Sequence, residues 1–146
     1  MRYVIDASVA VKWLLPEEHS EQAESLLVES STFSAPDLLF AEVGNSLWKR
    51  VRGRELTQEA GREALLRLLE IEILVTPASL LLDKAFELAC EHDRTVYDSI
   101  YLALAVEERA SFVTGDKRLY NAMHRTSLAN RIVWVGSLTV ERSDEA

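Results

Sequence analysis

Short apolar segments that alternate with helical patterns are the feature that most constrains how this chain can fold. Each segment has the length of a buried strand, and the segments are residues 2–5, 32–35, 71–75, 111–114 and 132–135. One or two helical patterns separate most neighbouring segments. Because strands joined through helices run parallel, this order predicts an α/β fold: a three-layer sandwich with a central, mainly parallel sheet flanked by helices.

The helices are predicted from the spacing of apolar residues and from residues that favour helix ends. Pro16 ends a first helix that begins at Ser8, and Gly53 closes a helix that opens at Pro36. Thr57 is the predicted N-cap of the next helix. The remaining helices are expected at residues 17–29, 76–90 and 95–108.

The length and composition predict one soluble domain. The chain has 146 residues, of which 1–140 are expected to form the domain and 141–146 a frayed tail. An apolar fraction of 48% is sufficient for a continuous core. The longest purely apolar stretch, residues 100–106, is far shorter than the roughly 20 residues needed to cross a bilayer. The single cysteine, Cys90, can form no internal disulfide, which suits a cytoplasmic location.

The charge of the chain gives two opposing indications. A net charge of −8 argues against binding to nucleic acid, whose phosphates attract surplus lysine and arginine. However, residues 49–54 read KRVRGR, and other basic residues lie close in sequence to the acids Asp6 and Asp116. A basic rim around an acidic, metal-filled centre would reconcile the negative net charge with binding to nucleic acid. The candidate nucleic-acid-binding residues of this rim are Lys12, Lys49, Arg50, Lys117 and Arg118.

Two acids directly follow predicted strands. Asp6 comes after YVI, and Asp116 comes after SFVTG. In a parallel sheet, functional groups gather beyond the carboxyl ends of the strands, at a crevice in the sheet. Each acid also has a structural explanation, since aspartate is a good N-cap in a strand-to-helix turn. Position alone therefore leaves both interpretations open.

Two further acids lie within predicted helices. Glu42 has no basic residue three or four positions away, and Asn45 continues its stripe one turn on. Asp98 lies three residues after Thr95, in the first turn of a predicted helix. Because this helix is almost wholly apolar from residue 100 to 106, its first turn is expected to lie deep in the fold. A solvated helix face is the alternative for Glu42, and a capping box is the alternative for Asp98.

Taken together, these four carboxylates predict a metal site. In one crevice they would repel one another and raise one another's pKa values unless a cation neutralised them. Oxygen ligands favour hard ions, and magnesium commonly binds through few carboxylates while it keeps several waters. The expected cofactor is therefore Mg²⁺, or Mn²⁺ in its place. Such an ion can polarise a phosphoryl oxygen and generate hydroxide from water.

Four segments of the chain resemble the PIN domain ribonucleases, and most closely the VapC toxins of prokaryotic toxin and antitoxin pairs. The segments are VIDASV with Asp6, APDLLFAEVGNSLWK with Glu42, YDSIYLALA with Asp98 and FVTGDKRL with Asp116. No single segment is specific, but together they stand in the order and approximate spacing of the family. The resemblance spans nearly the whole chain and implies a PIN-like fold with metal-dependent endoribonuclease activity.

The resemblance implies a role for each matched residue. The catalytic acids would be Asp6, Glu42, Asp98 and Asp116. Asp6 and Asp98 would bind the metal, and Glu42 and Asp116 would bind it directly or through water. Polar residues that would support the acids by hydrogen bonds are Ser8, Asn45 and Thr114. The implied reaction is attack of a metal-activated water on an RNA phosphodiester, and it requires no histidine.

The resemblance also implies partners. A VapC-like chain would form a homodimer and bind a VapB-like antitoxin that covers the acidic groove, and no membrane partner is expected. The implied substrate is RNA. Transfer, ribosomal and messenger RNA all remain open, because groove shape and the geometry of single-stranded loops select among them.

Two other functions remain open at this point. A non-catalytic PIN-like module would retain the acids but act through RNA or protein contacts. A magnesium-dependent phosphatase or receiver-like domain also places an aspartate at a strand end. The phosphatase is the weaker alternative, because Ser8 stands where many such enzymes have a second aspartate.

Overall fold

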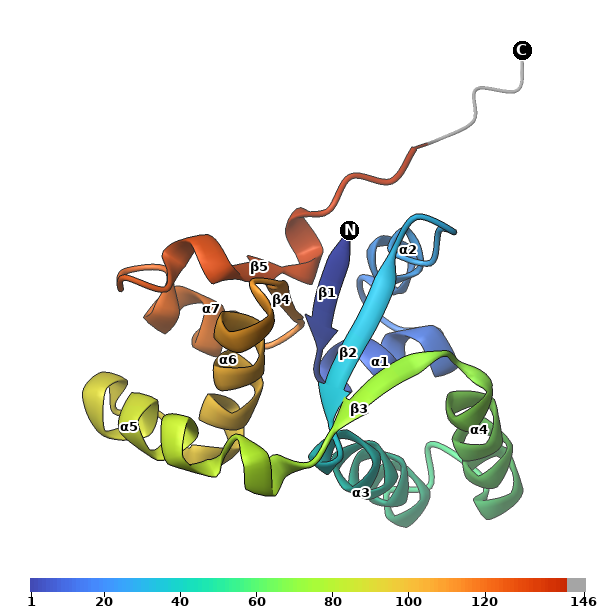
Figure 1. Ribbon diagram of the computed structural model, residues 1–146. Helices are drawn as coiled ribbons and strands as arrows, with labels where there is room; N and C mark the ends of the chain where they lie inside the picture. Colours follow the sequence, from blue (N-terminus) through green and yellow to red (C-terminus); the bar gives the residue numbers. More distant parts are fainter. Residues whose placement is uncertain (142–146) are drawn as a thin grey trace.

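Five parallel strands form one sheet in residues 1–141, the part of the chain that the computed structural model describes (Figure 1). The strands are β1 (Arg2–Ile5), β2 (Thr32–Pro36), β3 (Ile73–Thr76), β4 (Ser111–Thr114) and β5 (Ile132–Trp134). Their order across the sheet is β3-β2-β1-β4-β5, and every neighbouring pair is parallel. The predicted α/β class and parallel sheet are confirmed.

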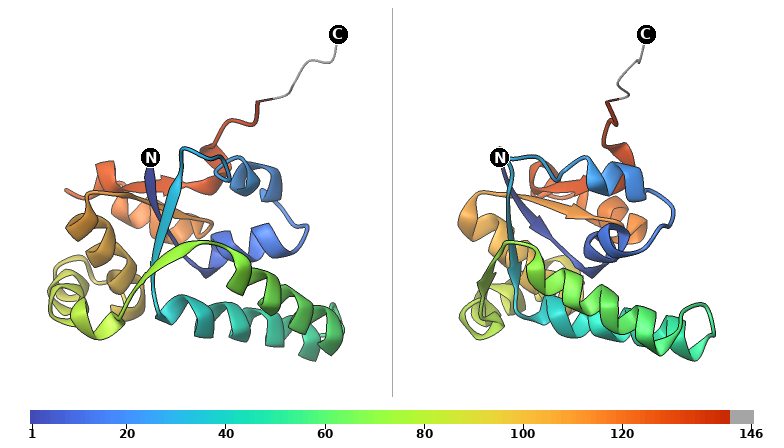
Figure 2. Two further views of the ribbon diagram at one scale, coloured as in Figure 1. Left: turned by 45° about the vertical axis from the view of Figure 1, so that its right-hand side comes forward. Right: turned by 90° about the vertical axis from the view of Figure 1, so that its right-hand side faces the viewer.

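Helices cover both faces of this sheet (Figures 1 and 2). One face carries α1 (Ala7–Leu14), α2 (Ser20–Glu24), α3 (Leu38–Arg52) and α4 (Gln58–Glu70). The other face carries α5 (Leu82–His92), α6 (Val96–Glu108) and α7 (Lys117–Met123). Short 3₁₀ turns lie at Ala78–Leu80, Ala129–Arg131 and Val135–Ser137. Figure 2 shows α3 and α4 packed side by side beyond the edge of the sheet.

The two faces of the sheet have separate hydrophobic cores. Successive residues of a strand point to opposite faces. Accordingly, Val4 and Phe112 belong to the core under α5, α6 and α7, while Ile5 and Val113 belong to the core under α1, α3 and α4. Helix α6 is buried at every residue from Ser99 to Ala105. A helix buried all round presents no polar face, which explains its nearly uninterrupted apolar sequence.

The side of the sheet on which the chain adds new strands changes between β1 and β4. From β1 the chain proceeds to β2 and β3 on one side, and it later places β4 and β5 on the other. A crevice forms at such a switch point, beyond the carboxyl ends of the two central strands. Asp6 follows β1, and Gly115 and Asp116 follow β4, so both predicted acids lie at this position.

The helix predicted for residues 17–29 is much shorter in the structure, where α2 spans only Ser20–Glu24. The Ser20 hydroxyl accepts a hydrogen bond from the Glu17 N–H and donates one to the Leu15 carbonyl. His19 has a left-handed backbone with φ of 65°. These contacts hold residues 15–19 in a turn, so the helix begins later than the apolar spacing suggested.

The helix predicted for residues 76–90 also begins later, because a 3₁₀ turn precedes α5. The Asp37 carboxylate accepts the Ala78 N–H at 2.9 Å and ties this turn to the start of α3. The helix expected to open at Pro36 begins at Leu38 instead, because Pro36 is the last residue of β2. Three other predicted helix ends are confirmed. Thr57 and Thr95 cap α4 and α6 through their side chains, and Gly53 follows the last residue of α3.

Within residues 1–141, no helix combines the length and the apolar character that crossing a bilayer requires. Of the tail predicted at residues 141–146, only residue 141 belongs to the described part of the chain.

Candidate metal centre

Asp6 is the most deeply buried acid of the candidate set, with 9% of its surface exposed. It is the N-cap of α1, and its Oδ1 accepts hydrogen bonds from the Ser8 hydroxyl and the Val9 N–H. Its Oδ2 accepts a 2.6 Å hydrogen bond from the Thr114 hydroxyl. The structural explanation for Asp6 is therefore correct, but a cap alone requires only one of these contacts. The remaining hydrogen bonds fix the carboxylate in the crevice.

Thr114 and Ser8 connect the ends of β4 and β1. The Thr114 hydroxyl donates to Asp6 and accepts the Asp116 N–H at 3.0 Å, while the Ser8 hydroxyl accepts the Gly115 N–H at 2.7 Å. A Cβ at position 115 would lie about 3.0 Å from the Ser8 hydroxyl oxygen, which is tighter than ordinary contact. Gly115 thus allows the turn after β4 to approach α1 closely enough to unite the two acidic segments.

Asp116 is the N-cap of α7, where its Oδ1 accepts the N–H groups of Arg118 and Leu119. The cap interpretation is correct here too. Both cap contacts use Oδ1, and no hydrogen bond to Oδ2 is found among the described residues. Asp116 is exposed, so Oδ2 is accessible to a ligand in the crevice.

Glu42 projects from α3 and is held by a residue of another helix. The hydroxyl of Tyr101, in α6, donates a 3.1 Å hydrogen bond to Glu42 Oε1. Tyr101 is 2% exposed and stacks on Phe112 of β4, with ring centroids 5.7 Å apart. This contact with the core shows that Glu42 does not belong to a simple solvated helix face, which was its structural alternative.

Asp98 lies in the first turn of α6, as predicted. The Thr95 side chain caps the helix by accepting the Asp98 backbone N–H at 3.1 Å. This cap uses the backbone of residue 98. The helix end is consequently satisfied whether or not the Asp98 side chain is ionised.

The pKa values indicate that the four acids share one site. Burial, followed by repulsion from Asp116, raises the pKa of Asp6, although its hydrogen bonds counteract part of this effect. Burial raises the pKa of Glu42, with added repulsion from Asp6 and Asp98. Burial and repulsion from Asp116 raise the pKa of Asp98. Each acid thus repels two of the others, which forms a closed ring of unfavourable interactions.

The donor set suits a hard divalent cation. All four side chains offer carboxylate oxygens, and a cation would convert their mutual repulsion into attraction. Within residues 1–141, no three histidine, cysteine, aspartate or glutamate side chains lie close enough together to hold a metal ion. Mg²⁺ typically binds one or two carboxylates and retains several waters, so an open set of acids is compatible with it.

The polar residues expected to support the acids differ in their contacts. Ser8 and Thr114 both donate hydrogen bonds to Asp6. Asn45 lines a groove of about 390 Å³ together with Ser8 and Glu42. It makes no side-chain hydrogen bond to an acid among the described residues, so its supporting role stays a prediction.

Three of the five candidate RNA-binding residues line the same groove as Glu42, namely Lys12, Lys49 and Arg50. Lys12 and Arg50 both form ion pairs with Glu17, a residue that the sequence did not single out. Lys49 has no carboxylate partner within 4 Å among the described residues and is exposed.

The two other basic candidates follow Asp116. Lys117 Nζ lies 3.5 Å from the centroid of the Trp134 ring and 5.3 Å from that of Tyr120. Arg118 is exposed, and its backbone contributes to the Asp116 cap. The basic rim is therefore present on two sides of the acids, but two of its members share an ion pair with the single carboxylate of Glu17.

Tyr101, Glu17 and Trp134 were missed because their contacts join distant parts of the chain. Only Tyr101 carried a usable signal: it lies three residues after Asp98 and hence on the same face of α6. Nothing along the chain relates Glu17 to Arg50, or Trp134 to Lys117.

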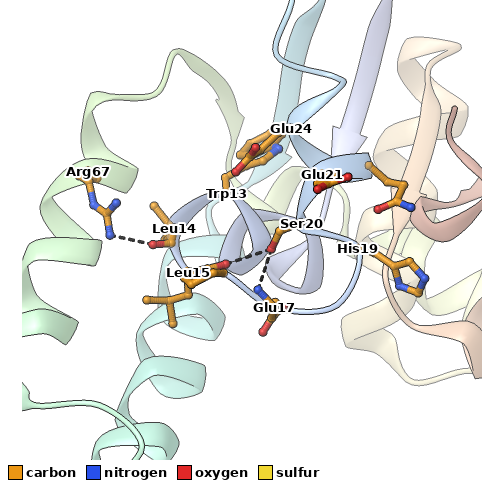
Figure 3. A pocket seen from close by; sticks show the side chains of 11 residues that line it. Trp13, Leu14, Leu15, Glu17, His19, Ser20, Glu21, Glu24 and Arg67 are labelled. Atoms are coloured by element: carbon orange, nitrogen blue, oxygen red, sulfur yellow. Dashed lines mark hydrogen bonds between the residues drawn. The ribbon is translucent and has the colours of Figure 1, made fainter. Parts of the chain in front are cut away.

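A second cavity, of about 540 Å³, lies between the segment that connects α1 to α2 and Arg67 of α4 (Figure 3). The Arg67 guanidinium donates to the Leu14 carbonyl at 2.7 Å along its wall. None of the four candidate acids lines it. Although it is larger than the groove beside Glu42, it lacks the chemistry of a metal centre.

Comparisons with known proteins agree with this geometry. A PIN domain family model matches residues 3–124, which include all four candidate acids. Ribonuclease VapC3 of Pyrobaculum aerophilum is 36% identical over 121 residues, or 82% of this chain and 92% of that protein.

Two crystal structures share the fold. PAE2754 from Pyrobaculum aerophilum has a TM-score of 0.66 and 24% identity, and the match covers 92% of this chain and 84% of that one. VapBC2 from Rickettsia felis, bound to a DNA fragment from their promoter, has a TM-score of 0.63 and 14% identity, with 92% of this chain and 98% of that one covered. From the family-model match and the VapC3 identity, we conclude that this chain belongs to the PIN domain family.

Proposed function

We propose that this protein is a metal-dependent endoribonuclease and the toxin of a VapBC-type toxin and antitoxin pair. The observation that carries the proposal is the ring of four mutually repelling carboxylates at the switch point of the sheet. A protein gains nothing in stability from such repulsion, so a ligand or a reaction is the better explanation. The name of its relative, ribonuclease VapC3, supports RNA as the substrate.

The proposed cofactor is Mg²⁺, or Mn²⁺ in its place. Asp6 and Asp98 would bind it directly, and Glu42 and Asp116 would do so directly or through water. When bound, such an ion polarises the scissile phosphoryl group, activates water and neutralises the leaving oxygen.

The residues around the acids hold them for this task. Ser8 and Thr114 orient the two oxygens of Asp6, and Tyr101 orients Glu42. Such supporting hydrogen bonds commonly affect metal affinity or activity about ten- to 100-fold. The uncompensated cations Lys49 and Lys117 would attract the RNA backbone from two sides of the crevice.

The test is RNA cleavage by the purified protein with Mg²⁺, Mn²⁺ or chelator, followed by sequencing of RNA ends after controlled expression in cells. Asp6→Asn and Asp98→Asn should both abolish cleavage. Asp83→Asn is a matched control, because Asp83 also occupies the first turn of a helix but is exposed. Loss of cleavage in Asp83→Asn would contradict the assignment of the site.

The same assay distinguishes the two alternatives. RNA binding without metal-dependent cleavage would indicate a non-catalytic module. Hydrolysis of a small phosphomonoester with intact RNA would indicate a phosphatase. The RNA ends would also identify the substrate class, which groove geometry decides.

We further propose a VapB-like antitoxin partner, a homodimer and a cytoplasmic location. The similarity to VapBC2 of Rickettsia felis supports the partner. Leu82 and Phe86, one turn apart on α5, are 51% and 62% exposed and favour a protein interface. Light scattering of the wild type and of Phe86→Glu would measure the oligomeric state, and a monomeric wild type would exclude the dimer.

A further inference from the structure

Glu17 forms ion pairs with two cations of the groove at once. Its Oε1 lies 3.1 Å from Lys12 Nζ, and its Oε2 accepts from the guanidinium of Arg50, which is 33 residues away in sequence. The three side chains are 12%, 21% and 29% exposed for Lys12, Glu17 and Arg50. The cluster is thus a largely sheltered arrangement rather than a surface ion pair.

This cluster opens into the groove that contains a candidate catalytic acid. Lys12, Glu17 and Arg50 line the same cavity of about 390 Å³ as Glu42 and Ser8, and Ser8 holds Asp6. A chain of RNA whose scissile phosphate approached the acids would bring a neighbouring phosphate along this groove. The two cations therefore stand where a second phosphate needs a partner.

The two cations are arranged for an anion with two oxygens. Arginine and lysine bind carboxylate and phosphate through the same charged hydrogen bonds, so the Glu17 carboxylate occupies the position that a phosphate would take. Two cations against one carboxylate leave a surplus of one positive charge. Lys12 Nζ also donates to the Glu18 carbonyl at 2.8 Å, which would hold the ammonium in place after Glu17 departs.

The Glu17 side chain can leave without movement of its backbone. The Glu17 N–H donates to the Ser20 hydroxyl at 2.9 Å, and this hydroxyl donates to the Leu15 carbonyl at 3.0 Å (Figure 3). The backbone of the segment that connects α1 to α2 is therefore tied down. Displacement therefore requires rotation about side-chain bonds and exchange of the two ion pairs for contacts with a phosphate, but no movement of the backbone.

We propose that Lys12 and Arg50 form a binding subsite for an RNA backbone phosphate, and that Glu17 occupies this subsite until RNA displaces it. The inference rests on the proposed function, because it takes RNA as the substrate. It adds a specific phosphate site and an internal competitor for it.

The test measures binding of a short, fluorescently labelled single-stranded RNA of mixed sequence, by anisotropy at several salt concentrations. All variants carry Asp98→Asn, so that the probe stays intact. Glu17→Gln should bind about fivefold more tightly, since it removes one competing charge in direct contact with the cations. Glu18→Gln is the matched control, because it makes the same charge change at the following residue, on a side chain that is 86% exposed.

Lys12→Met and Arg50→Met should each weaken binding and reduce the slope of log affinity against log salt by about 0.7. In a chain that lacks both cations, Glu17→Gln should affect affinity no more than Glu18→Gln. Circular dichroism checks folding, and Glu17→Ala serves as a second variant, because it empties the subsite without adding an amide.

The outcomes separate this inference from the proposed function. Equal affinities of Glu17→Gln and Glu18→Gln, or salt slopes unchanged by Lys12→Met and Arg50→Met, would overturn the subsite. If the chain with Asp98 intact then still cleaves RNA, the proposed function survives alone. Tighter binding by Glu17→Gln without any cleavage by the intact chain would support the subsite and contradict the nuclease.

Discussion

The Thr114 hydroxyl donates a 2.6 Å hydrogen bond to Oδ2 of Asp6, although 108 residues separate them in sequence. Thr114→Val keeps the shape of the side chain but removes this donor. We expect cleavage to fall about ten- to 100-fold and unfolding free energy to fall by about 1 to 3 kcal/mol. RNA cleavage and thermal melts measure both. Thr114→Ser should retain activity, and an inactive serine variant would contradict the role of the hydroxyl.

Tyr101→Phe removes the hydrogen bond to Glu42 but preserves the stacking on Phe112. We expect cleavage to fall about tenfold, because Glu42 loses a group that orients it. The loss of stability should be only about 1 kcal/mol. Kinetics and denaturant unfolding of the same preparation test the two effects. A large loss of stability with normal activity would make Tyr101 purely structural.

Asp98→Asn should leave the metal-free protein at least as stable as the wild type. The substitution removes a charge that Asp116 repels, while the Thr95 cap survives because it uses the residue 98 backbone. Thermal melts in chelator measure this. Addition of Mg²⁺ should then stabilise the wild type more than the variant, since a ligand stabilises the folded state that binds it. A marked drop in melting temperature in chelator would favour the capping-box explanation.

The metal-free protein should become more stable on mild acidification. The folded-state pKa values of Asp6, Glu42 and Asp98 all lie above their ordinary values, chiefly through burial. The folded state consequently binds more protons, so stability is greatest below the ordinary carboxyl pKa and declines as pH rises through the folded pKa. Melts in chelator at successively lower pH, from neutral towards the ordinary carboxyl pKa, should show rising melting temperatures. A flat profile in the wild type would contradict the raised pKa values.

Lys117 should bind RNA with the help of Trp134, whose ring holds its ammonium group. Lys117→Met should weaken RNA binding and reduce the salt slope by about 0.7. Trp134→Leu should weaken binding by a factor that corresponds to about 0.5 to 1 kcal/mol, whereas Trp134→Phe should be nearly neutral. The effects of Lys117→Met and Trp134→Leu should not add, because the ring acts through the lysine. Additive losses in a double-mutant cycle would show that the two residues act independently.

Errors in the predicted elements have local physical causes. Apolar spacing suggested a helix over residues 17–29, but Ser20 forms hydrogen bonds that hold the preceding residues in a turn. The start of α5 shifted because Asp37, distant in sequence, binds the Ala78 N–H. In each case a side-chain hydrogen bond competed with the helix, and residue spacing does not report such competition.

The order of the strands and of helices α1 to α6 followed from the sequence alone, because periodic burial is a property of neighbouring positions, whereas α7 was not predicted. The choice of the four acids as candidates also came from the sequence, through residue type and the resemblance to a family. Only the tertiary structure decided which cations remain free. Glu17 forms ion pairs with both Lys12 and Arg50, whereas Lys117 lies on Trp134. The same holds for the bonds that orient Asp6 and Glu42 from β4 and α6. These contacts join residues that the sheet brings together from distant parts of the chain, and their energies depend on distances that no local pattern contains.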